Sequence, residues 1–240
     1  MESRSPRTKK SRSLSGAFIT FEGTEGCGKT TQCRRLARSL RAQGYQVLET
    51  REPGGTPLAE AIRKLLLTSS KAKDHMESIT PSCESMLILA ARSQHVVHVI
   101  QPALAKGMIV LCDRFFDSTL AYQGYARGLD KTFLKEAQRF IANGLQPHLT
   151  FFLDLPVEEG LARRKRSIEH NRLDHESLSF HQRVRRGFLA LAKEYPKRIK
   201  KIDATKLPHT LSAQIGSMTE AIIHKKSSFG VTRSSSKMKA

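Results

Sequence analysis

The sequence predicts an α/β fold with a parallel sheet, and three observations lead to that prediction. The chain has 240 residues, 39% hydrophobic and 26% charged, which suits one large globular domain. Five short apolar runs rich in β-branched and aromatic residues alternate with stretches of helical composition. A glycine-rich segment follows the first of these runs. Strands that alternate with helices pair in parallel through right-handed crossovers, so one continuous sheet is expected.

The expected elements are assigned along the chain as follows. The buried-strand candidates are residues 17–21, 45–48, 108–112, 149–155 and 199–202. The stretches of helical composition are residues 29–43, 57–67, 81–105, 132–142, 156–166, 177–194 and 208–224. Ligand-binding loops of such sheets lie at the carboxyl ends of the strands, so functional motifs are expected just after each strand.

The two ends of the chain differ in composition from the part between them. The formal net charge is +19, which would attract phosphate, nucleic acid or an anionic surface. Residues 1–16 hold five basic residues and one acidic residue, and residues 225–240 hold five basic residues and no acidic one. Both segments are rich in Ser, Lys and Arg and poor in apolar residues, so we expect disordered tails around a single domain of residues 17–224.

Composition also predicts where the protein works. No apolar run approaches the roughly 18 residues that span a bilayer, and the N-terminus lacks the apolar stretch of a secretory signal. An Arg- and Ser-rich start is also found in organelle transit peptides, but the short length and missing apolar face disfavour that interpretation. The four cysteines form no CxxC pair and no metal-type spacing with the histidines. We therefore expect a soluble cytoplasmic protein without membrane contact.

The first strand candidate runs into GTEGCGKT, residues 23–30, which matches the phosphate-binding motif GxxxxGK[ST] in its strand-to-helix context. The glycines let the backbone curl, so that N–H groups and the following helix N-terminus surround phosphates. Lys29 is expected to reach the β- and γ-phosphates of ATP, and the Thr30 hydroxyl to bind Mg²⁺. The expected nucleotide-binding residues are Gly23, Gly26, Gly28, Lys29, Thr30 and Thr31.

The residues after the third strand candidate narrow the reaction class. A GTPase needs a guanine-reading NKxD sequence, and neither asparagine of the chain begins one. An ATP-hydrolysing motor usually has Asp followed by Glu at this place, whereas this chain has Asp113 followed by Arg114. Asp113 can serve the Mg²⁺ shell together with Thr30, but Arg114 cannot act as a base and suits an anionic acceptor. The pattern favours transfer of a phosphoryl group to a second phosphate.

Three further segments place arginines near the predicted site. Arg51 lies in the loop TREPGGT after the second strand candidate, and Arg92 lies in a long helical stretch. Residues 113–124, DRFFDSTLAYQG, interleave charge, hydroxyls, an aromatic ring and an amide. This mixture fits a nucleotide, because Arg binds phosphate, Tyr packs on a sugar or base, and Gln reads a base edge. Taken singly, Arg51 and Arg92 are more often surface or salt-bridging residues, and Tyr122 is as often core as ligand.

Six segments resemble, in order and spacing, those of the bacterial-type thymidylate (dTMP) kinase family. They cover about residues 17–205 and read FEGTEGCGKTTQ, TREPGGTPLAEAIRKLLL, AARSQHVVHVIQPALAKG, DRFFDSTLAYQGYARGL, LTFFLDLP and RLDHESLSFHQRVRRGFLALA. The resemblance implies a P-loop nucleoside monophosphate kinase fold with a five-stranded parallel sheet. It also implies phosphorylation of dTMP to dTDP with ATP and Mg²⁺, and a homodimer.

The same resemblance implies roles for individual residues. Glu25 matches the acid that faces the dTMP 3′-hydroxyl, and Arg51 and Arg114 match the arginines that hold the acceptor phosphate. The residues that match contacts to the thymine edge or the nucleoside are Arg92, Ser118, Thr119, Tyr122 and Gln123.

Residues 160–172, GLARRKRSIEHNR, resemble the lid of this family, at about residues 160–176. In bacterial-type members the lid supplies catalytic arginines because their P-loop lacks one, and no arginine lies in this P-loop either. Arg163 and Arg172 match the family pattern best, and Arg164 and Arg166 are the alternatives. A solvated basic turn is the other interpretation of this run. A lid cation would screen charge on the transferring phosphoryl group.

The chain departs from the family at Ile88, where a Phe that stacks on thymine is usual. Base packing is then aliphatic or is supplied by Phe115 or Phe116. A kinase for dUMP or for a modified pyrimidine deoxynucleotide is therefore the nearest alternative. A nucleic-acid-binding protein is a second alternative, motivated by the charge. No aromatic RNP pattern or finger spacing supports it, so we expect no specific nucleic-acid partner.

Overall fold

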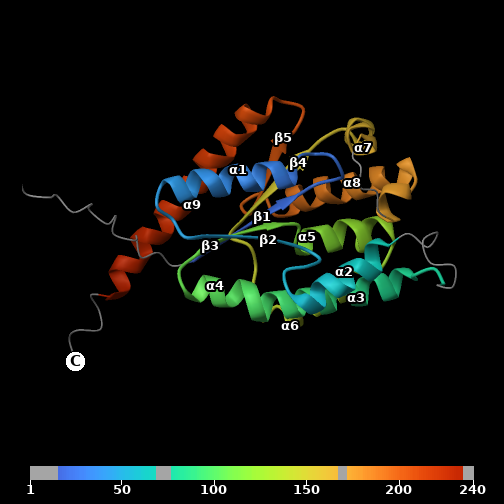
Figure 1. The fold of residues 1–240 in the computed structure, drawn as a ribbon, viewed down its shortest axis with the longest axis horizontal. Coiled ribbons are helices and arrows are strands. Elements are labelled where there is room, and N and C mark those ends of the chain that lie inside the picture. Colours follow the sequence, from blue (N-terminus) through green and yellow to red (C-terminus); the bar gives the residue numbers. More distant parts are fainter. Residues whose placement is uncertain (1–15, 69–76, 167–171, 235–240) are drawn as a thin grey trace, which may run out of the picture.

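The sheet has five parallel strands in the order β2-β3-β1-β4-β5 (Figure 1), as the alternation of apolar runs predicts. The computed structural model describes residues 16–68, 77–166 and 172–234, with residues 225–234 described by their backbone only. The strands are β1 (Ala17–Glu22), β2 (Val47–Arg51), β3 (Ile109–Asp113), β4 (Leu149–Asp154) and β5 (Ile199–Asp203). The predicted fold class is confirmed.

The register brings the carboxyl ends of the three strands that carry motifs to one edge. Phe21 of β1 and Arg51 of β2 both pair with Asp113 of β3. The P-loop follows β1 directly, and Arg114 follows β3. The segments singled out after three different strands therefore meet at one place.

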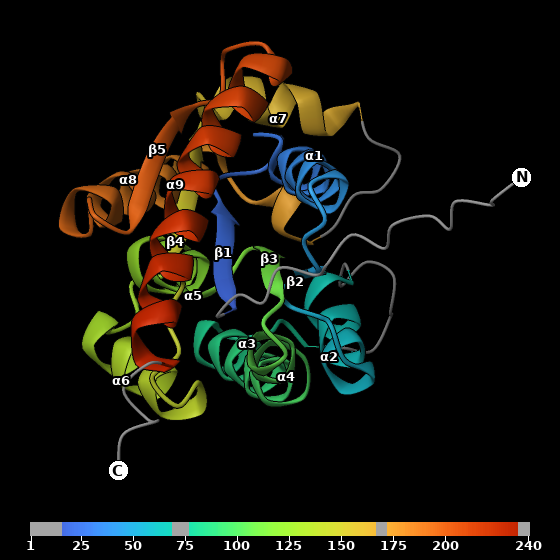
Figure 2. The ribbon, with the colours of Figure 1, turned by 90° about the vertical axis from the view of Figure 1, so that its left-hand side faces the viewer.

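Helices cover both faces of the sheet (Figure 2). They are α1 (Lys29–Ala42), α2 (Pro57–Leu67), α3 (Pro81–His95), η2 (Val96–Ile100), α4 (Gln101–Ala105), α5 (Phe116–Thr119), η3 (Leu120–Ala126), α6 (Lys131–Ile141), α7 (Val157–Lys165), η4 (Arg172–His175), α8 (Leu178–Glu194) and α9 (Pro208–Ser234). Alternate residues of β1 point to opposite faces. Ile19 and Phe21 pack in the core cluster with α1 and α9, whereas Phe18 packs with η2 and α4.

The N-terminus of α1 differs from those of α2 and α3 in how its first backbone N–H groups are satisfied. Thr56 and Thr80 cap α2 and α3 by accepting hydrogen bonds from the backbone N–H groups of Ala59 and Cys83. In contrast, α1 begins after Gly28, which has φ 94° and offers no side-chain cap. The first N–H groups of α1 thus remain available to an anion.

Three details differ from the sequence expectations. The second strand runs from Val47 to Arg51 rather than over 45–48. The prediction missed its last three residues because they are polar and only partly buried or exposed. The stretch 81–105 consists of α3, the π-helical η2 and α4 in succession. The C-terminal tail expected from residue 225 begins inside α9, which runs to Ser234, since extending an existing helix adds one hydrogen bond per residue.

The other sequence expectations about the ends of the chain concern residues 1–15 and 235–240, which lie outside the described residues. Within the part that the structure describes, no helix is long and apolar enough to cross a membrane.

Candidate active site

A cavity of about 600 Å³ opens at the carboxyl edge of the sheet, between the P-loop and the ends of β2 and β3. It brings together Lys29 and Thr30 with Arg51, Asp113 and Arg114, as the sequence predicts. Its walls are rich in cations, which suit phosphate groups. The basic residues that line it are Lys29, Arg34, Arg51, Arg63, Arg114 and Arg164.

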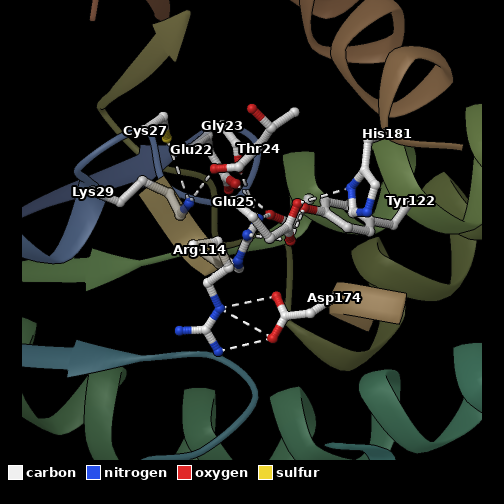
Figure 3. Close-up of polar contacts among 12 residues, drawn as sticks. Glu22, Gly23, Thr24, Glu25, Cys27, Lys29, Arg114, Tyr122, Asp174 and His181 are labelled. Atoms are coloured by element: carbon white, nitrogen blue, oxygen red, sulfur yellow. Dashed lines mark hydrogen bonds and ion pairs between the residues drawn. The ribbon is translucent and has the colours of Figure 1, made fainter. Parts of the chain in front are cut away.

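The P-loop is held by contacts that only glycine allows. Gly26 has φ 70°, and a Cβ atom there would lie 2.1 Å from the carbonyl oxygen of Gly160 in α7. Lys29 Nζ donates a hydrogen bond to the Thr24 carbonyl oxygen at 2.7 Å, so its ammonium lies back on the loop (Figure 3). The loop therefore packs against the start of the expected lid, and its lysine is ordered in this conformation.

Thr30 and Asp113 form a pair of oxygen ligands at the cavity wall. The Thr30 hydroxyl donates a hydrogen bond to Asp113 Oδ2, which joins the start of α1 to the end of β3. No group of three or more His, Cys, Asp or Glu residues suited to a metal occurs among the described residues. The donor set fits Mg²⁺, which prefers oxygen ligands and usually takes only one or two from protein carboxylates beside phosphates and water.

Arg114 adopts a strained backbone conformation, with φ 71°. Its guanidinium donates to the Gly23 carbonyl oxygen at 2.9 Å, to Ser118 Oγ at 3.1 Å and to Glu25 Oε1 at 3.1 Å. Burial alone would lower the pKa of Arg114, but the neighbouring Tyr122 and Glu25 raise it. Arg114 is thus a fixed cation between the P-loop and the helix that follows β3.

Arg51 and Arg63 face the same cavity from β2 and α2. Arg51 Nη2 lies 3.1 Å from Glu60 Oε2, and Arg63 donates to the Pro53 carbonyl oxygen at 2.9 Å. Burial and the charge of Arg51 lower the pKa of Arg63. The sequence analysis missed Arg63, although its spacing of three residues from Glu60 places both on one face of α2.

A second pocket, of about 70 Å³, adjoins the large cavity and shares Glu52, Pro53, Arg114 and Leu173 with it. All side chains expected around the nucleoside line this pocket: Ile88, Arg92, Ser118, Thr119, Tyr122 and Gln123. Phe115 lines it as well, but the Arg92 guanidinium lies over that ring at 5.1 Å. Phe116 is not among the lining residues, whereas Ile88 is.

Arg92 is a buried anchor rather than a surface residue. Its side chain is 2% exposed, and its Nε lies 2.5 Å from Glu52 Oε2. The other oxygen of Glu52 lies 3.0 Å from His95 Nδ1, and Arg92 Nη1 donates to Gln138 Oε1 at 3.2 Å. Sequence analysis missed Glu52 as the partner of Arg92, because the two residues are 40 positions apart.

The arginines of the expected lid lie in different places. Arg164 lines the large cavity, and its Nε and Nη2 each lie 2.9 Å from an oxygen of Asp174. Arg163 is exposed and lies 3.7 Å from Glu159 on its own helix. Arg172 pairs with Glu84 and donates to the Leu66 carbonyl oxygen at 3.0 Å. Arg163 and Arg172 therefore line neither cavity in this conformation, because α7 and η4 direct them elsewhere.

The rest of the lid gives less information. Arg166 is the C-terminal cap of α7, and residues 167–171 lie outside the described residues.

Gln123 donates to Glu84 at 2.8 Å, so the same buried carboxylate fixes Gln123 at the pocket and Arg172 away from it. Although burial opposes it, the contacts with Arg172 and Gln123 lower the pKa of Glu84, which stays charged.

Glu22, at the end of β1, organises the turn after β3 and was missed by the sequence analysis. Its Oε1 accepts from the Phe115 N–H at 2.7 Å, and its Oε2 accepts from Ser118 Oγ at 2.5 Å. Burial and the nearby Asp117 raise the pKa of Glu22 to about 8. A glutamate at the end of an otherwise apolar strand was the available signal.

Glu25 connects the P-loop to the wall of the small pocket (Figure 3). Its Oε1 accepts from the Tyr122 hydroxyl at 2.5 Å and from Arg114 at 3.1 Å. On its other side, Oε2 lies 3.2 Å from Nδ1 of His181, a residue of α8. Burial would raise the pKa of Glu25, but contacts with His181 and Arg114 lower it, so the carboxyl is charged.

Comparisons with known proteins give a consistent result. A family model described as thymidylate kinase matches residues 21–215. A thymidylate kinase of Thermomicrobium roseum is 52% identical over 196 residues, which cover 81% of this chain and 90% of that protein. A thymidylate kinase of Synechococcus sp. is 50% identical over 203 residues, covering 85% and 94%. The crystal structure of thymidylate kinase from Ehrlichia chaffeensis is similar with a TM-score of 0.68 at 33% identity, covering 85% of this chain and 99% of that one.

Proposed function

The chain belongs to the thymidylate kinase family, which phosphorylates dTMP to dTDP with ATP, and we propose how its own residues serve that reaction. One domain, residues 17–224, carries both substrate sites. The observation that carries the proposal is the junction of the two cavities. A large cavity at the P-loop, lined by six basic and five acidic side chains, meets a small pocket whose lining includes apolar, hydroxyl and amide side chains, and Arg114 forms part of both walls.

The large cavity holds the phosphates of ATP. The free N–H groups at the start of α1 and the curled P-loop backbone surround them, with Gly23, Gly26 and Gly28 allowing the close approach. Lys29 leaves the Thr24 carbonyl oxygen and contacts the β- and γ-phosphates, and Thr30 and Thr31 complete this side. The cavity position of Lys29 supports this role.

Thr30 and Asp113 hold Mg²⁺ in this proposal. Their two oxygen atoms lie together at the cavity wall, which supports the assignment. When bound, the ion supplies positive charge beside the phosphates. Asp113 also fixes the Thr30 hydroxyl, and so the first turn of α1, against the sheet.

The small pocket holds the dTMP nucleoside, and its phosphate points into the large cavity. Arg92 and Gln123 read the thymine edge, Ile88 packs on the base, and Ser118, Thr119 and Tyr122 surround the sugar. Their shared position in one pocket supports this assignment. Arg51 and Arg114 hold the acceptor phosphate from opposite sides, which aligns it with the γ-phosphate for in-line transfer.

Arg164 is the lid cation in this proposal, in place of Arg163 and Arg172. Its position on the cavity wall supports the choice, since Arg163 is exposed and Arg172 is paired with Glu84. A guanidinium already bound to Asp174 can still offer N–H groups to a phosphoryl oxygen, because Arg has five donors.

A homodimer is proposed on the basis of exposed apolar side chains on neighbouring helices. Met86 of α3, Val97 of η2 and Phe133 and Phe140 of α6 are exposed, and Phe140 is 84% exposed. Because α3 packs against α6, these side chains belong to neighbouring elements. Exposed apolar groups of this kind mark protein interfaces. Replacing Phe140 with Asp should shift the protein from dimer to monomer in light-scattering measurements, and a monomeric wild type would contradict the proposal.

A reducing compartment such as the cytoplasm is the proposed location. The cysteines Cys27, Cys33, Cys83 and Cys112 are free thiols, and three of them are buried. Free thiols of this kind are usual in proteins that work in reducing compartments.

A coupled assay of ADP formation tests the acceptor assignment. ATP and Mg²⁺ are supplied with dTMP, dUMP or dCMP, and with DNA as a further addition. We expect the highest kcat/KM with dTMP, because the apolar side chains that line the small pocket, Ile88 among them, would gain contact area from the thymine methyl group. Equal efficiency with dUMP would show that the pocket does not use the thymine methyl group, and turnover stimulated only by DNA would overturn the proposal.

A further inference from the structure

Glu25 and His181 lie side by side, with unsatisfied polar atoms on both. His181 Nδ1 is 3.2 Å from Glu25 Oε2, and the two side chains are only 1% and 9% exposed. The contact lacks the alignment of a hydrogen bond, so Oε2 and both ring nitrogens of His181 make none in this structure. Buried polar atoms without partners are uncommon and costly, and each requires a physical explanation.

The two oxygens of the Glu25 carboxylate are used differently. Oε1 accepts from the Tyr122 hydroxyl and from Arg114, and both of these side chains line the small pocket. Glu25 itself lines the large cavity. In the proposed function the carboxylate therefore lies near the sugar of the acceptor nucleotide. Oε2 is buried and accepts no hydrogen bond in this structure, so its lone pairs remain for a donor.

His181 is placed to control the direction of that oxygen. It is the fourth residue of α8, and its ring meets the neighbouring Phe180 ring edge-on at a centroid distance of 5.6 Å. An apolar side chain at position 181 would fill the same space but would place carbon, not nitrogen, against the buried Glu25 carboxylate. Carbon in that position would leave the charge of Glu25 with one polar contact fewer.

We propose that His181 is a positioning residue that turns Glu25 Oε2 toward the 3′-hydroxyl of the acceptor deoxynucleotide. This inference rests on the proposed function and on the role that the family resemblance implies for Glu25, that of the acid facing this hydroxyl. With the acceptor bound, the Nδ1–H group of His181 donates to one lone pair of Oε2 and the sugar hydroxyl donates to the other, so that Nδ1 and Oε2 both gain partners.

Three substitutions in the full-length protein separate this role from packing. The amide nitrogen of Asn takes the place of Nδ1, whereas that of Gln takes the place of Nε2, and Phe offers no donor. His181→Asn, His181→Gln and His181→Phe are compared with the wild type for kcat/KM with dTMP and with 3′-deoxythymidine monophosphate. His209→Asn, at an exposed position of α9, is the matched control for loss of a histidine.

We expect the wild type and His181→Asn to prefer dTMP over the 3′-deoxy analogue to a similar degree. His181→Gln and His181→Phe should lower that preference by about tenfold, the order expected when a hydrogen bond to a charged group is weakened. The loss in kcat/KM should be seen with dTMP alone, because the analogue has no 3′-hydroxyl to donate a hydrogen bond to Glu25. A variant with equal losses on both substrates would show that His181 is only structural and would overturn the inference.

Glu25→Gln tests the placement of Glu25 at the sugar separately from the role of His181. If Glu25→Gln lowers the preference but no His181 variant does, His181 is not the positioning residue and the placement of Glu25 stands. If Glu25→Gln leaves the preference unchanged, or the wild type has none, the placement of Glu25 at the sugar fails and the inference falls with it. Thermal unfolding midpoints identify variants that do not fold, and the Asn and Gln variants decide the outcome if Phe is not tolerated.

Discussion

Replacing Glu22 with Gln should reduce the loss in the free energy of unfolding that this protein shows as pH rises from mildly acidic to mildly alkaline values. Glu22 is fully buried at the end of β1 and holds the Phe115 N–H and the Ser118 hydroxyl. Burial and Asp117 raise the pKa of Glu22 from 4.5 to about 8. A Gln side chain imitates the protonated acid, since its oxygen accepts from the Phe115 N–H while its amide donates to Ser118 Oγ.

The sign of the effect follows from proton linkage. Between pH 4.5 and 8 the native state holds a proton on Glu22 that the unfolded state has released, so the free energy of unfolding falls as pH rises. The contribution is fully present below pH 4.5 and is lost as pH rises through 8. One proton gives a slope of at most about 1.4 kcal/mol per pH unit, so the expected loss from pH 5 to 8 is roughly 3 kcal/mol.

Urea unfolding at intervals from pH 5 to 8.5 measures this slope. The wild type should lose stability relative to Glu22→Gln as pH rises, so that the difference between the two proteins changes by about 3 kcal/mol. Glu136→Gln, at an exposed position of α6, is the control and should keep the wild-type slope. Parallel curves for the wild type and Glu22→Gln would refute the reasoning, because they would mean that Glu22 takes up no proton on folding.

Three further predictions concern the transfer reaction. Lys29→Ala should fold normally but lose nearly all dTMP phosphorylation, because Lys29 contacts charge that redistributes during transfer; substantial turnover in a well-folded variant would exclude it from the mechanism. In rapid-quench single-turnover experiments, Arg164→Ala should slow transfer about a hundredfold or more with little change in dTMP affinity, whereas Arg163→Ala should have a small effect; the reverse order would assign the lid role to Arg163. Ile88→Phe should tighten dTMP binding up to about tenfold by calorimetry, because a ring adds a stacking contribution that Ile lacks, and weaker binding would mean that the pocket cannot admit it.

The fold could be predicted because its signals are local in the sequence. Each strand is a short apolar run, and the GxxxxGK[ST] match lies directly between β1 and α1. Parallel pairing then follows from the alternation with helices. The range predicted for the second strand ended too early, because Glu49, Thr50 and Arg51 are polar. These residues nevertheless pair with β3 in register. Hydropathy reports burial, and this strand is only partly buried.

Many of the residues that line each cavity could also be predicted, although Arg63 was missed, but the partners of these residues could not. The buried pairs join distant parts of the chain: Arg92 and Glu52 are 40 positions apart, and Arg172 and Glu84 are 88 apart. Which acid meets which arginine depends on how α2, α3 and η4 pack, and no periodicity reports that. Arg163 and Arg172, the lid arginines that match the family pattern best, line neither cavity in this structure, whereas the alternative Arg164 lines the large one.

The pairing of arginines with acids also bears on how the site selects its ligand. Arg51, Arg92, Arg114 and Arg164 each contact a carboxylate of the protein itself. Such pairing avoids the large cost of a buried unpaired charge. A phosphate entering the large cavity therefore meets guanidiniums whose charge is already partly compensated, and it binds through the N–H groups that the carboxylates leave free. A ligand that offers only phosphate gains little from such groups, whereas a nucleotide adds base and sugar contacts in the small pocket. Since Arg114 lies in both walls, the two sets of contacts act on one side chain.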